Sequence, residues 1–403
     1  MESFVCAFRG RRDAYQAPLA LEEGGLLDMF ITDIYATPWI SRFASLAPAA
    51  TRVKLARRSE PGISPNHVRC LLGTAIVESS RHLLGFSPEL TYKTLDPEFS
   101  RAAAKRAAET RSSLFLYSPY AWEAFVARYR YTPRKVLFQY HPHPRLEQRL
   151  LADDGLRYRA TGESSSAAVA VRIPEHLASR EWDAWKHADL IVCASTFTRQ
   201  SLLEAGADEK VCRVVPYGVE TPTISPQTSK PENFHVAFVG SGSPRKGLHH
   251  LLMAWRKAAL PESSSLTLVC RVIDPELNRM AIETPRTKIV RGLAQPQLDA
   301  LYADSTLFAM PSLVEGFGQV YLEALARGCP VLGTANTCLP DLGSERNGIF
   351  LSTPGNIDEL AGTLERLARM LPGNSALRDA ARECAEKYTW PAFRNGLREI
   401  LAN

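Results

Sequence analysis

Residues 311–331 decide the fold of this chain, and they read PSLVEGFGQVYLEALARGCPV. Leu322, Leu325 and Ala326 form the apolar stripe of a helix, at spacings of three and four residues. Gly328 suits a left-handed helix cap, and Pro330 prevents the helix from continuing. The stretch therefore predicts a strand end, a loop, a helix and a second strand, which is the repeating unit of a parallel sheet covered by helices.

The same alternation continues on both sides of this stretch. Short apolar runs predict strands at residues 4–8, 27–35, 113–117, 135–140, 189–194, 234–239, 265–272, 288–291, 307–310 and 330–333. Four prolines between positions 216 and 231 mark the most linker-like segment. We therefore expect an α/β fold with two Rossmann-like, doubly wound parallel-sheet domains, at residues 1–215 and 233–385, joined by a linker at 216–232.

The loop before the central helix has the residues of an anion site. Gly316 and Gly318 let the backbone turn tightly and approach a ligand. Free amides at the start of the helix, from Gly318 to Val320, attract an anion. Glu315 and Glu323 flank this position, Glu323 about 7 to 8 Å along the helix axis from Gly318. The pattern favours a diphosphate at the helix tip, with sugar hydroxyls bound by a carboxylate on each side.

The full string E-G-F-G-x-x-x-L-E-A-x-A-x-G-x-P-V, which contains an E-x7-E motif, resembles the retaining glycosyltransferases of the GT-B fold, family 4 in the carbohydrate-active-enzyme classification. A surface helix with incidental acids is the alternative, and it leaves the two glycines and the aromatic residue of the loop unexplained. The resemblance implies two domains that face each other across a cleft. It is specific for roughly residues 185–403 and diffuse for residues 1–184.

A second loop, residues 238–248, reads FVGSGSPRKGL. It fails the G-x-G-x-x-G dinucleotide pattern because Arg245 holds the place of the third glycine, and it lacks the G-K-[ST] of a phosphate loop. It resembles the G-R-L-x-x-x-K-G loop of the same family, in which an Arg and a Lys neutralise the departing diphosphate. Lys246 matches the Lys, Ser241 stands where the family has Arg, and whether Arg245 supplies that charge is open.

The resemblance also implies the remaining contacts with the donor. Arg291 and Gly292 end a strand at the position that holds the nucleotide base, and Glu323 binds the ribose hydroxyls. The transferred sugar is bound by Glu315 together with the Phe317 and Gly318 amides. The amides of Gln319 and Val320 complete the helix tip, with Gly316 in the turn before it.

In the first domain, histidines follow the strand at 135–140. His141 matches a family His that faces the donor sugar; His143 in that role, or both histidines as loop structure, stays open. Gly10 fits the family's glycine after the first strand, where the acceptor or diphosphate approaches, and a plain turn glycine is the alternative. The two histidines could share a metal ion, but no third ligand lies nearby in the sequence, which also has no D-x-D pair. The resemblance implies no metal and no cofactor besides the nucleotide sugar.

The end of the chain resembles a tail that crosses back onto the first domain. It comprises residues 386–403, in which Tyr388, Thr389 and Trp390 precede an amphipathic helix.

Composition narrows the class of protein. The 403 residues are 45% hydrophobic and 23% charged, which is typical of a globular chain. The start of the sequence lacks a secretory signal, and no apolar run reaches the roughly 18 to 20 residues that a membrane span needs. Eight scattered cysteines without a C-x-x-C motif indicate reduced thiols. These features predict a cytoplasmic protein.

The distribution of charge along the sequence indicates which kinds of partner the chain can bind. Lys and Arg outnumber Asp and Glu by 29 to 24 through Val215, and the two are equal after it. The excess is too small for nucleic acid and favours an anionic surface or ligand at the first half. Residues 39–58 combine apolar and basic side chains without an acid, which suits peripheral contact with an anionic membrane at the inner face of the cytoplasmic membrane. A solvated helix packed on the sheet is the alternative.

Taken together, the residues and the resemblance imply a retaining, metal-independent hexosyltransferase of polysaccharide biosynthesis. It would move a sugar from a nucleotide diphosphate to a glycan or lipid-linked acceptor, with Lys246, Glu315 and His141 as the catalytic residues. Two alternatives are an epimerase or phosphorylase-like enzyme with the same cleft, and a non-catalytic sugar-nucleotide-binding subunit, which the Ser241 departure supports.

Overall fold

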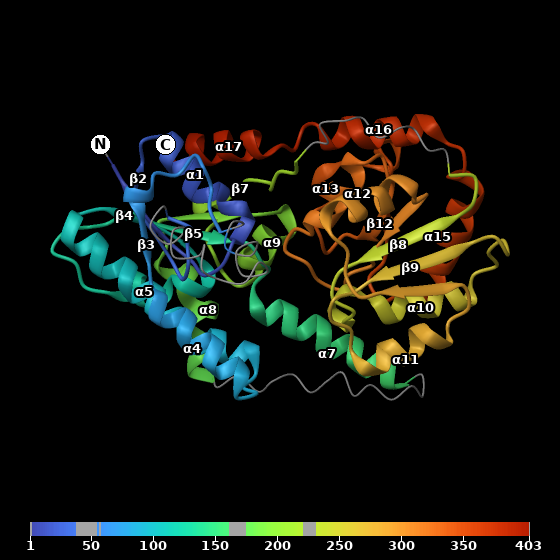
Figure 1. The fold of residues 1–403 in the computed structure, drawn as a ribbon, viewed down its shortest axis with the longest axis horizontal. Coiled ribbons are helices and arrows are strands. Elements are labelled where there is room, and N and C mark those ends of the chain that lie inside the picture. Colours follow the sequence, from blue (N-terminus) through green and yellow to red (C-terminus); the bar gives the residue numbers. More distant parts are fainter. Residues whose placement is uncertain (1, 38–54, 56–57, 161–174, 221–230, 403) are drawn as a thin grey trace.

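The computed structural model describes residues 2–37, 55, 58–160, 175–220 and 231–402. Figure 1 shows two lobes that each hold one sheet. The two doubly wound parallel-sheet domains expected from the sequence are present.

The first domain is built on a seven-stranded parallel sheet in the order β3-β2-β1-β4-β5-β6-β7. Its strands are β1 (Phe4–Ala7), β2 (Leu27–Thr32), β3 (Val68–Cys70), β4 (Ser113–Tyr117), β5 (Lys135–Gln139), β6 (Leu190–Cys193) and β7 (Cys212–Val214). The order reverses between β1 and β4, so the carboxyl ends of these two strands form the switch point where ligands of such sheets bind.

The second domain holds a six-stranded parallel sheet in the order β10-β9-β8-β11-β12-β13. Its strands are β8 (His235–Val239), β9 (Ser265–Val269), β10 (Thr287–Val290), β11 (Leu307–Ala309), β12 (Val331–Thr334) and β13 (Ile349–Ser352). Here the switch point lies between β8 and β11. Lys246 lies on the loop after β8, and Glu315 lies on the loop after β11. Because the strands are parallel, both loops leave the same edge of the sheet.

Three strands were missing from the sequence prediction. β3 and β7 are three-residue edge strands of mixed burial, so neither shows an apolar run. The strand β13 follows a 3-10 turn at Glu345–Asn347 and has an exposed residue in its centre. The strand expected at 27–35 ends at Thr32, since its carboxyl end bends into the loop with Asp33.

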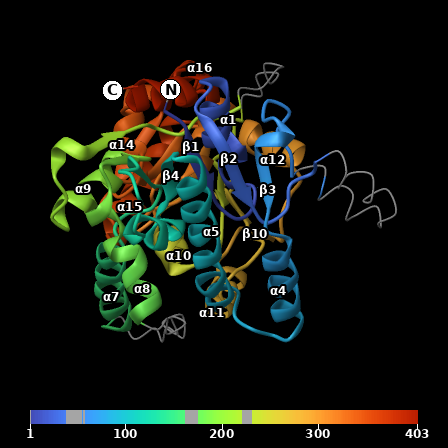
Figure 2. The same ribbon diagram turned by 90° about the vertical axis from the view of Figure 1, so that its left-hand side faces the viewer.

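Helices cover both sheets. Those of the first domain are α1 (Gln16–Glu23), α4 (Leu72–Leu83), α5 (Pro88–Thr110), α6 (Trp122–Val126), α7 (Pro144–Ala160), α8 (Glu175–Asp183) and α9 (Thr196–Glu204). In Figure 2, α5 crosses the sheet, and it contacts β1, β2 and β4. Those of the second domain are α10 (Leu248–Lys257), α11 (Pro275–Glu283), α12 (Gln295–Asp304), α13 (Gln319–Ala326), α14 (Leu339–Leu342), α15 (Ile357–Met370) and α16 (Ser375–Ala385).

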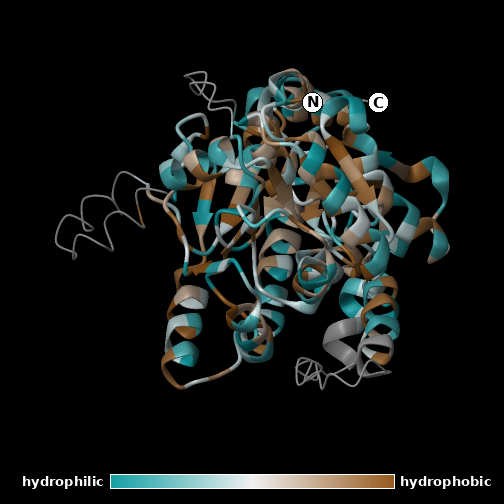
Figure 3. Cartoon of the chain, turned by 90° about the vertical axis from the view of Figure 1, so that its right-hand side faces the viewer, coloured by the Kyte–Doolittle hydropathy of each residue, from teal (hydrophilic) through white to brown (hydrophobic). Residues whose placement is uncertain are grey.

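The strands form the core of each domain. Every residue of β1, β4, β6, β11 and β12 is buried, which explains their continuous apolar runs. Figure 3 shows brown strands inside a layer of helices whose outer faces are largely teal. None of the helices in the described parts of the chain combines the length and the apolar character that a bilayer crossing requires.

Two helices connect the domains. The last helix, α17 (Trp390–Ala402), lies against α1 of the first domain, where Arg394 pairs with Glu23 at 2.9 Å (Figure 1). The helix α7 extends from the first domain toward α10 and α11 of the second (Figure 1). The domains are thus in contact through α17 at the top of the molecule as drawn and through α7, a helix of the first domain, at the bottom.

Candidate active site

A cleft of about 840 Å³ lies between the two domains. Its wall in the second domain comes from the loops after β8, β9 and β10 and from the helices α12 and α13. The opposite wall comes from the loop between β1 and α1, represented by Arg11, Asp13 and Ala14. The cleft therefore sits at the carboxyl ends of strands from both sheets, where doubly wound domains bind their ligands.

Four of the residues predicted as donor contacts line this cleft: Ser241, Gly292, Gln319 and Glu323. They come from two separate loops and one helix, so the topology brings together residues that lie about 80 positions apart in the sequence. The other predicted residues lie around the cleft, and their surroundings differ.

The helix α13 begins at the cleft. Its N-cap, Gly318, has a φ of 86°, a left-handed conformation that favours glycine. A Cβ at this position would lie 2.7 Å from the Tyr321 ring, so substitution is blocked by space as well as by backbone conformation. Glycine offers no side chain to cap the helix, and the first-turn amides beside Gln319 face a site for an anion. Val320 lies in the same turn, half-buried beside the wall.

Glu323 lies one turn further along α13. Its Oε2 accepts a hydrogen bond from the Tyr302 hydroxyl at 3.3 Å. Burial raises the pKa of Glu323, while Tyr302 and Arg327 act in the opposite direction. The arrangement fixes one carboxylate in the cleft wall, where it can accept hydrogen bonds from a ligand's hydroxyls.

Glu315 is buried in a cluster with two cations. Lys246 forms an ion pair with Glu315 Oε2, and the Arg245 guanidinium donates to the same oxygen at 3.1 Å. Burial alone would raise the pKa of Glu315, but Arg245, Lys246 and their hydrogen bonds lower it to about 2. Arg245 also lies 3.9 Å from Glu147 of α7. None of Arg245, Lys246 and Glu315 is among the residues that line the cleft, so the trio forms a charged layer next to it.

Gly316 joins the two domains. Its carbonyl oxygen accepts hydrogen bonds from Ser195 Oγ at 2.5 Å and Thr198 Oγ1 at 3.1 Å. A Cβ on Gly316 would lie 2.8 Å from the carbonyl carbon of Tyr140 and 2.9 Å from the Cα of His141. The absence of a side chain therefore lets the Glu315 loop pack directly on the ends of β5 and β6.

The two histidines after β5 have different surroundings. Burial lowers the pKa of His141 to about 3, so its ring is neutral at pH 7, and its buried Nδ1 has no hydrogen-bond partner among the described residues. Its ring lies 4.5 Å from that of Tyr140. His143 is buried in the first domain, where its Nε2 lies 3.0 Å from the Trp182 carbonyl oxygen. His141 thus adjoins the Glu315 cluster, whereas His143 packs against its own domain.

Three further predicted residues, Gly10, Phe317 and Arg291, are not among those that line the cleft. Gly10 has a φ of 82°, and its amide donates to Asp33 at 3.0 Å, as expected of a turn glycine. Phe317 is buried and packs edge-on against Tyr217, with ring centroids 5.4 Å apart. Arg291 is exposed and donates to Asn278 at 2.7 Å. Beside it Gly292, with a φ of 108°, does line the cleft.

The sequence analysis did not identify two arginines of the cleft wall, Arg11 and Arg271, or the strained turn at residues 13–15. Asp13, Ala14 and Tyr15 have φ of 48°, 49° and 65°, which is unfavourable for three successive residues other than glycine. Asp13 stabilises this turn by accepting hydrogen bonds from Tyr117 at 2.7 Å and Tyr217 at 2.8 Å. The cluster of arginines at 9, 11 and 12, immediately after the first strand, was the available signal.

Arg271 is the second missed cation. It follows β9, lines the cleft, and approaches within 3.2 Å of the position of a Cβ on Gly292. It lies at the carboxyl end of the sheet, as Arg11 does on the opposite side. Both arginines belong to the wall, so each domain contributes a cationic side chain to a cleft that is also lined by the carboxyl groups of Asp13, Glu220, Asp299 and Glu323.

Solved structures with this arrangement cover the whole chain. A sucrose-phosphate synthase from Thermosynechococcus elongatus has a TM-score of 0.69 at 17% identity, covering 100% of this chain and 98% of its own. The Anabaena protein HepE, in complex with UDP and glucose, has a TM-score of 0.61 at 16% identity and covers 100% of both chains. At such identities the likeness establishes the fold, and the fold is GT-B, as the sequence predicted.

Relatives among curated proteins match about half of the chain. An MMP alpha-(1->4)-mannosyltransferase from Mycolicibacterium hassiacum is 29% identical over 209 residues, 50% of this chain and 51% of its own length. The sulfoquinovosyl transferase SQD2 of Arabidopsis thaliana is 28% identical over 227 residues, 52% and 44% respectively. The chain thus spans about half the length of the curated relatives it matches. Residues 233–370, which contain Lys246, Glu315 and Glu323, match the family described as glycosyl transferases group 1.

Proposed function

We propose that this chain is a retaining glycosyltransferase of family 4 that moves a hexose from a nucleotide diphosphate to the hydroxyl of a glycan or lipid-linked glycan. The observation that carries the proposal is the position of Gln319 and Glu323 in one cleft wall, the start of a helix and a carboxylate one turn later. The domain match to glycosyl transferases group 1 supports the reaction class. HepE, a neighbour in fold, is recorded with UDP-glucose, which supports a nucleotide-sugar donor.

In this proposal the diphosphate binds at the start of α13. The first-turn amides bind its oxygens, and the helix dipole favours their negative charge. The trio of Arg245, Lys246 and Glu315 carries a net charge of +1 beside this position. It stabilises the charge that develops as the bond between the anomeric carbon and the diphosphate breaks. Arg11 and Arg271 add positive charge from the cleft walls.

The sugar and nucleoside occupy opposite sides of the diphosphate. Glu323 binds the ribose hydroxyls, and the wall at Ser241 and Gly292 accommodates the base. The transferred hexose lies toward His141 and Glu315. His141, neutral at pH 7, exchanges hydrogen bonds with the sugar without transferring a proton.

The transfer needs no side-chain nucleophile in this scheme. The acceptor hydroxyl attacks the anomeric carbon from the face that the diphosphate leaves, which retains the anomeric configuration. Its proton passes to the departing diphosphate oxygen, and the new glycosidic bond replaces the sugar–phosphate bond. The reaction requires no metal, because cationic side chains and the helix tip neutralise the diphosphate.

Membrane contact belongs to the same proposal, because a lipid-linked acceptor resides at a bilayer. Of the basic stretch at 39–58, only residues 55 and 58 are described. The nearby helix α4 and the turn after it expose apolar side chains, among them Ile76 at 67%, Leu83 at 88% and Leu84 at 74%. Replacing these three by Gln is expected to reduce sedimentation with anionic vesicles, and unchanged sedimentation would place the contact elsewhere. In a cell this would locate the chain in the cytoplasm at the inner face of the membrane.

The test of the proposed reaction starts with the donor. The purified chain is incubated with GDP-mannose or UDP-glucose, the donor types that the names of its relatives and structural neighbours suggest. Thermal stabilisation identifies the donor that binds. Proton NMR of the product from a simple glycoside acceptor then gives the anomeric configuration, which is expected to match that of the donor.

Other outcomes would support the alternatives. Conversion of the sugar nucleotide without consumption of acceptor would indicate an epimerase or phosphorylase-like enzyme. Tight binding without turnover under any acceptor would indicate a binding subunit. The presence of Ser241 where the family has Arg favours that second candidate. An inverted product would overturn the retaining mechanism.

A further inference from the structure

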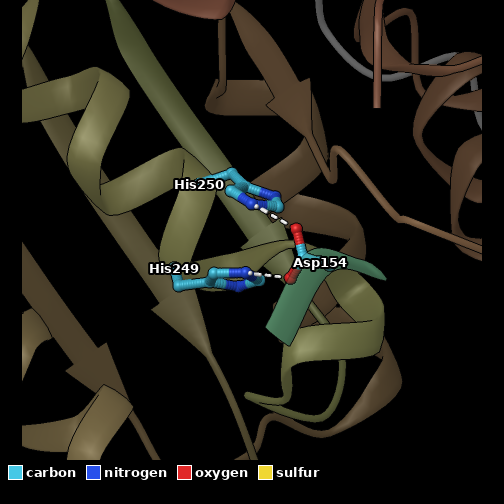
Figure 4. A group of neighbouring side chains, drawn as sticks. All are labelled: Asp154, His249 and His250. Atoms are coloured by element: carbon cyan, nitrogen blue, oxygen red, sulfur yellow. Dashed lines mark hydrogen bonds and ion pairs between the residues drawn. The ribbon is translucent and has the colours of Figure 1, made fainter. Parts of the chain in front are cut away.

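A buried cluster of metal-ligating side chains lies away from the cleft wall, where the two domains meet. It consists of Asp154 on α7 and of His249 and His250 on α10 (Figure 4). Figure 1 shows why these residues meet: α7 extends from the first domain to the helices of the second. The proposed transfer reaction uses none of the three.

The three side chains converge on a small volume. His249 Nε2 lies 2.9 Å from Asp154 Oδ2, and His250 Nε2 lies 2.9 Å from Oδ1. The candidate ligand atoms all lie within 4.8 Å of one another. The histidine rings are neighbours, with centroids 3.8 Å apart. In Figure 4 both rings direct a nitrogen toward the carboxylate between them.

The burial of these three polar side chains is unusual for a simple packing contact between helices. His249, His250 and Asp154 are exposed by only 2%, 4% and 6%. Burying polar and charged groups costs free energy that an apolar contact of the same size does not. His250 Nδ1 is also buried and has no hydrogen-bond partner among the described residues. Hydrogen bonding within the cluster therefore leaves a buried polar atom unsatisfied.

The side chains of the cluster are of the types that bind a cation. Two imidazoles and one carboxylate form a ligand set that zinc and similar divalent transition metals prefer.

We infer that Asp154, His249 and His250 bind a divalent transition-metal ion of the zinc class, and that this ion fastens α7 of the first domain to α10 of the second. Bonds of about 2.0 to 2.2 Å place neighbouring tetrahedral ligands about 3.3 Å apart. The candidate ligand atoms lie within 4.8 Å of one another, so any pair needs to approach by about 1.5 Å at most to reach this spacing. Each imidazole binds through Nε2 after its ring proton moves to Nδ1.

Space for a fourth ligand lies beside Gly355, in the loop between β13 and α15. A Cβ there would stand 3.5 Å from Asp154 Oδ1 and 3.8 Å from His250 Cε1, so the glycine leaves this side of the cluster open. A water molecule can occupy that position. The ion takes no part in the transfer reaction and has a structural role, so this site and the proposed metal-independent chemistry are separate.

Cobalt(II) provides the direct test, because its visible absorption reports tetrahedral coordination. The tag-free full chain is stripped with chelator and titrated with Co2+ at pH 7.5. We expect one ion per chain, a tetrahedral absorption band, displacement by Zn2+ and a rise in melting temperature with either metal. Asp154→Asn and His250→Gln are expected to weaken Co2+ binding by about 100-fold or more, since loss of even an outer-shell contact costs 10- to 100-fold.

His67→Gln is the matched control, because His67 also pairs with a carboxylate, Glu22 at 2.7 Å, but is a half-exposed surface residue. It should bind Co2+ like the parent chain. Absence of a tetrahedral band in the parent chain, or an equal band in the Asp154→Asn and His250→Gln chains, would overturn the inference. If either variant fails to fold, as judged by circular dichroism, the spectrum of the parent chain alone decides.

Discussion

Gly316→Ala is the sharpest perturbation of the candidate site, because one added methyl group meets the opposite domain. The new Cβ would lie 2.8 Å from the Tyr140 carbonyl carbon and closer still to its oxygen. The loop must therefore retreat from β5 until ordinary contact distances are restored. The hydrogen bonds from Ser195 and Thr198 to the Gly316 carbonyl span the same gap and would lengthen or break.

The cost follows from these contacts. Overpacking costs about 1 to 3 kcal/mol, and two weakened hydrogen bonds add about 1 kcal/mol each. A loss of about 3 to 5 kcal/mol lowers the melting temperature of a domain of this size by at least about 6 °C. In the proposed reaction, turnover should fall more steeply, because displacing Glu315 by about 1 Å would misplace the proposed catalytic groups and can cost about 100-fold.

Gly362→Ala supplies the control. Gly362 lies within α15, and a Cβ there would meet nothing within 4 Å. Alanine in a helix interior is about 0.5 to 1 kcal/mol more favourable than glycine, so this variant should melt slightly higher and keep its turnover. The melting temperature of both variants is measured by differential scanning calorimetry, and their turnover is measured in the transfer assay. If Gly316→Ala melts and turns over like the parent chain, the direct contact between the Glu315 loop and β5 is refuted.

Three further predictions concern the charges. Glu323→Ala should weaken nucleoside diphosphate binding by about 1 to 3 kcal/mol in calorimetric titration, and unchanged affinity would remove this residue from the site. Lys246→Ala should lower turnover by about 100- to 1000-fold, and a near-normal rate would refute its role. Because the pKa of Glu315 is lowered to about 2, its ionised form stabilises the fold fully above about pH 4.3, and that stabilisation is lost as pH falls toward 2. The difference in urea midpoint between the parent chain and Glu315→Gln should therefore narrow from pH 5 to pH 3; a constant difference would contradict this account.

The fold was predictable because fully buried parallel strands have a recognisable sequence pattern. All residues of β4 and β6 are buried, so each appears in the sequence as an uninterrupted apolar run between polar loops. The helix α13 was equally legible, from Gly318 at its start to Gly328 after its end. The edge strand β3 has one exposed residue among three, and such a strand has no pattern of its own.

The site was predictable only where local geometry imposes a residue type. Gly318 and Gly316 are required by backbone conformation and by close approach, and both stood out in the sequence. Arg271 and Asp154 gave no such signal, because their significance depends on which distant segment they meet. Periodicity records which face of an element is buried, and it does not record the partner across a domain boundary.

The contacts of residues 315–316 couple the chemistry to the arrangement of the domains. Glu315 holds Lys246 within the second domain, and the adjacent Gly316 carbonyl is held by Ser195 of the first. A rotation that separated the domains would have to break the bond to Gly316 or pull Glu315 away from Lys246. Because the buried ion pair is the stronger contact, the hydrogen bonds to Gly316 should yield first. In the proposed reaction, the cleft would then open for donor exchange while the charged cluster stays assembled, and turnover would depend on residues such as Ser195 that never touch the substrate.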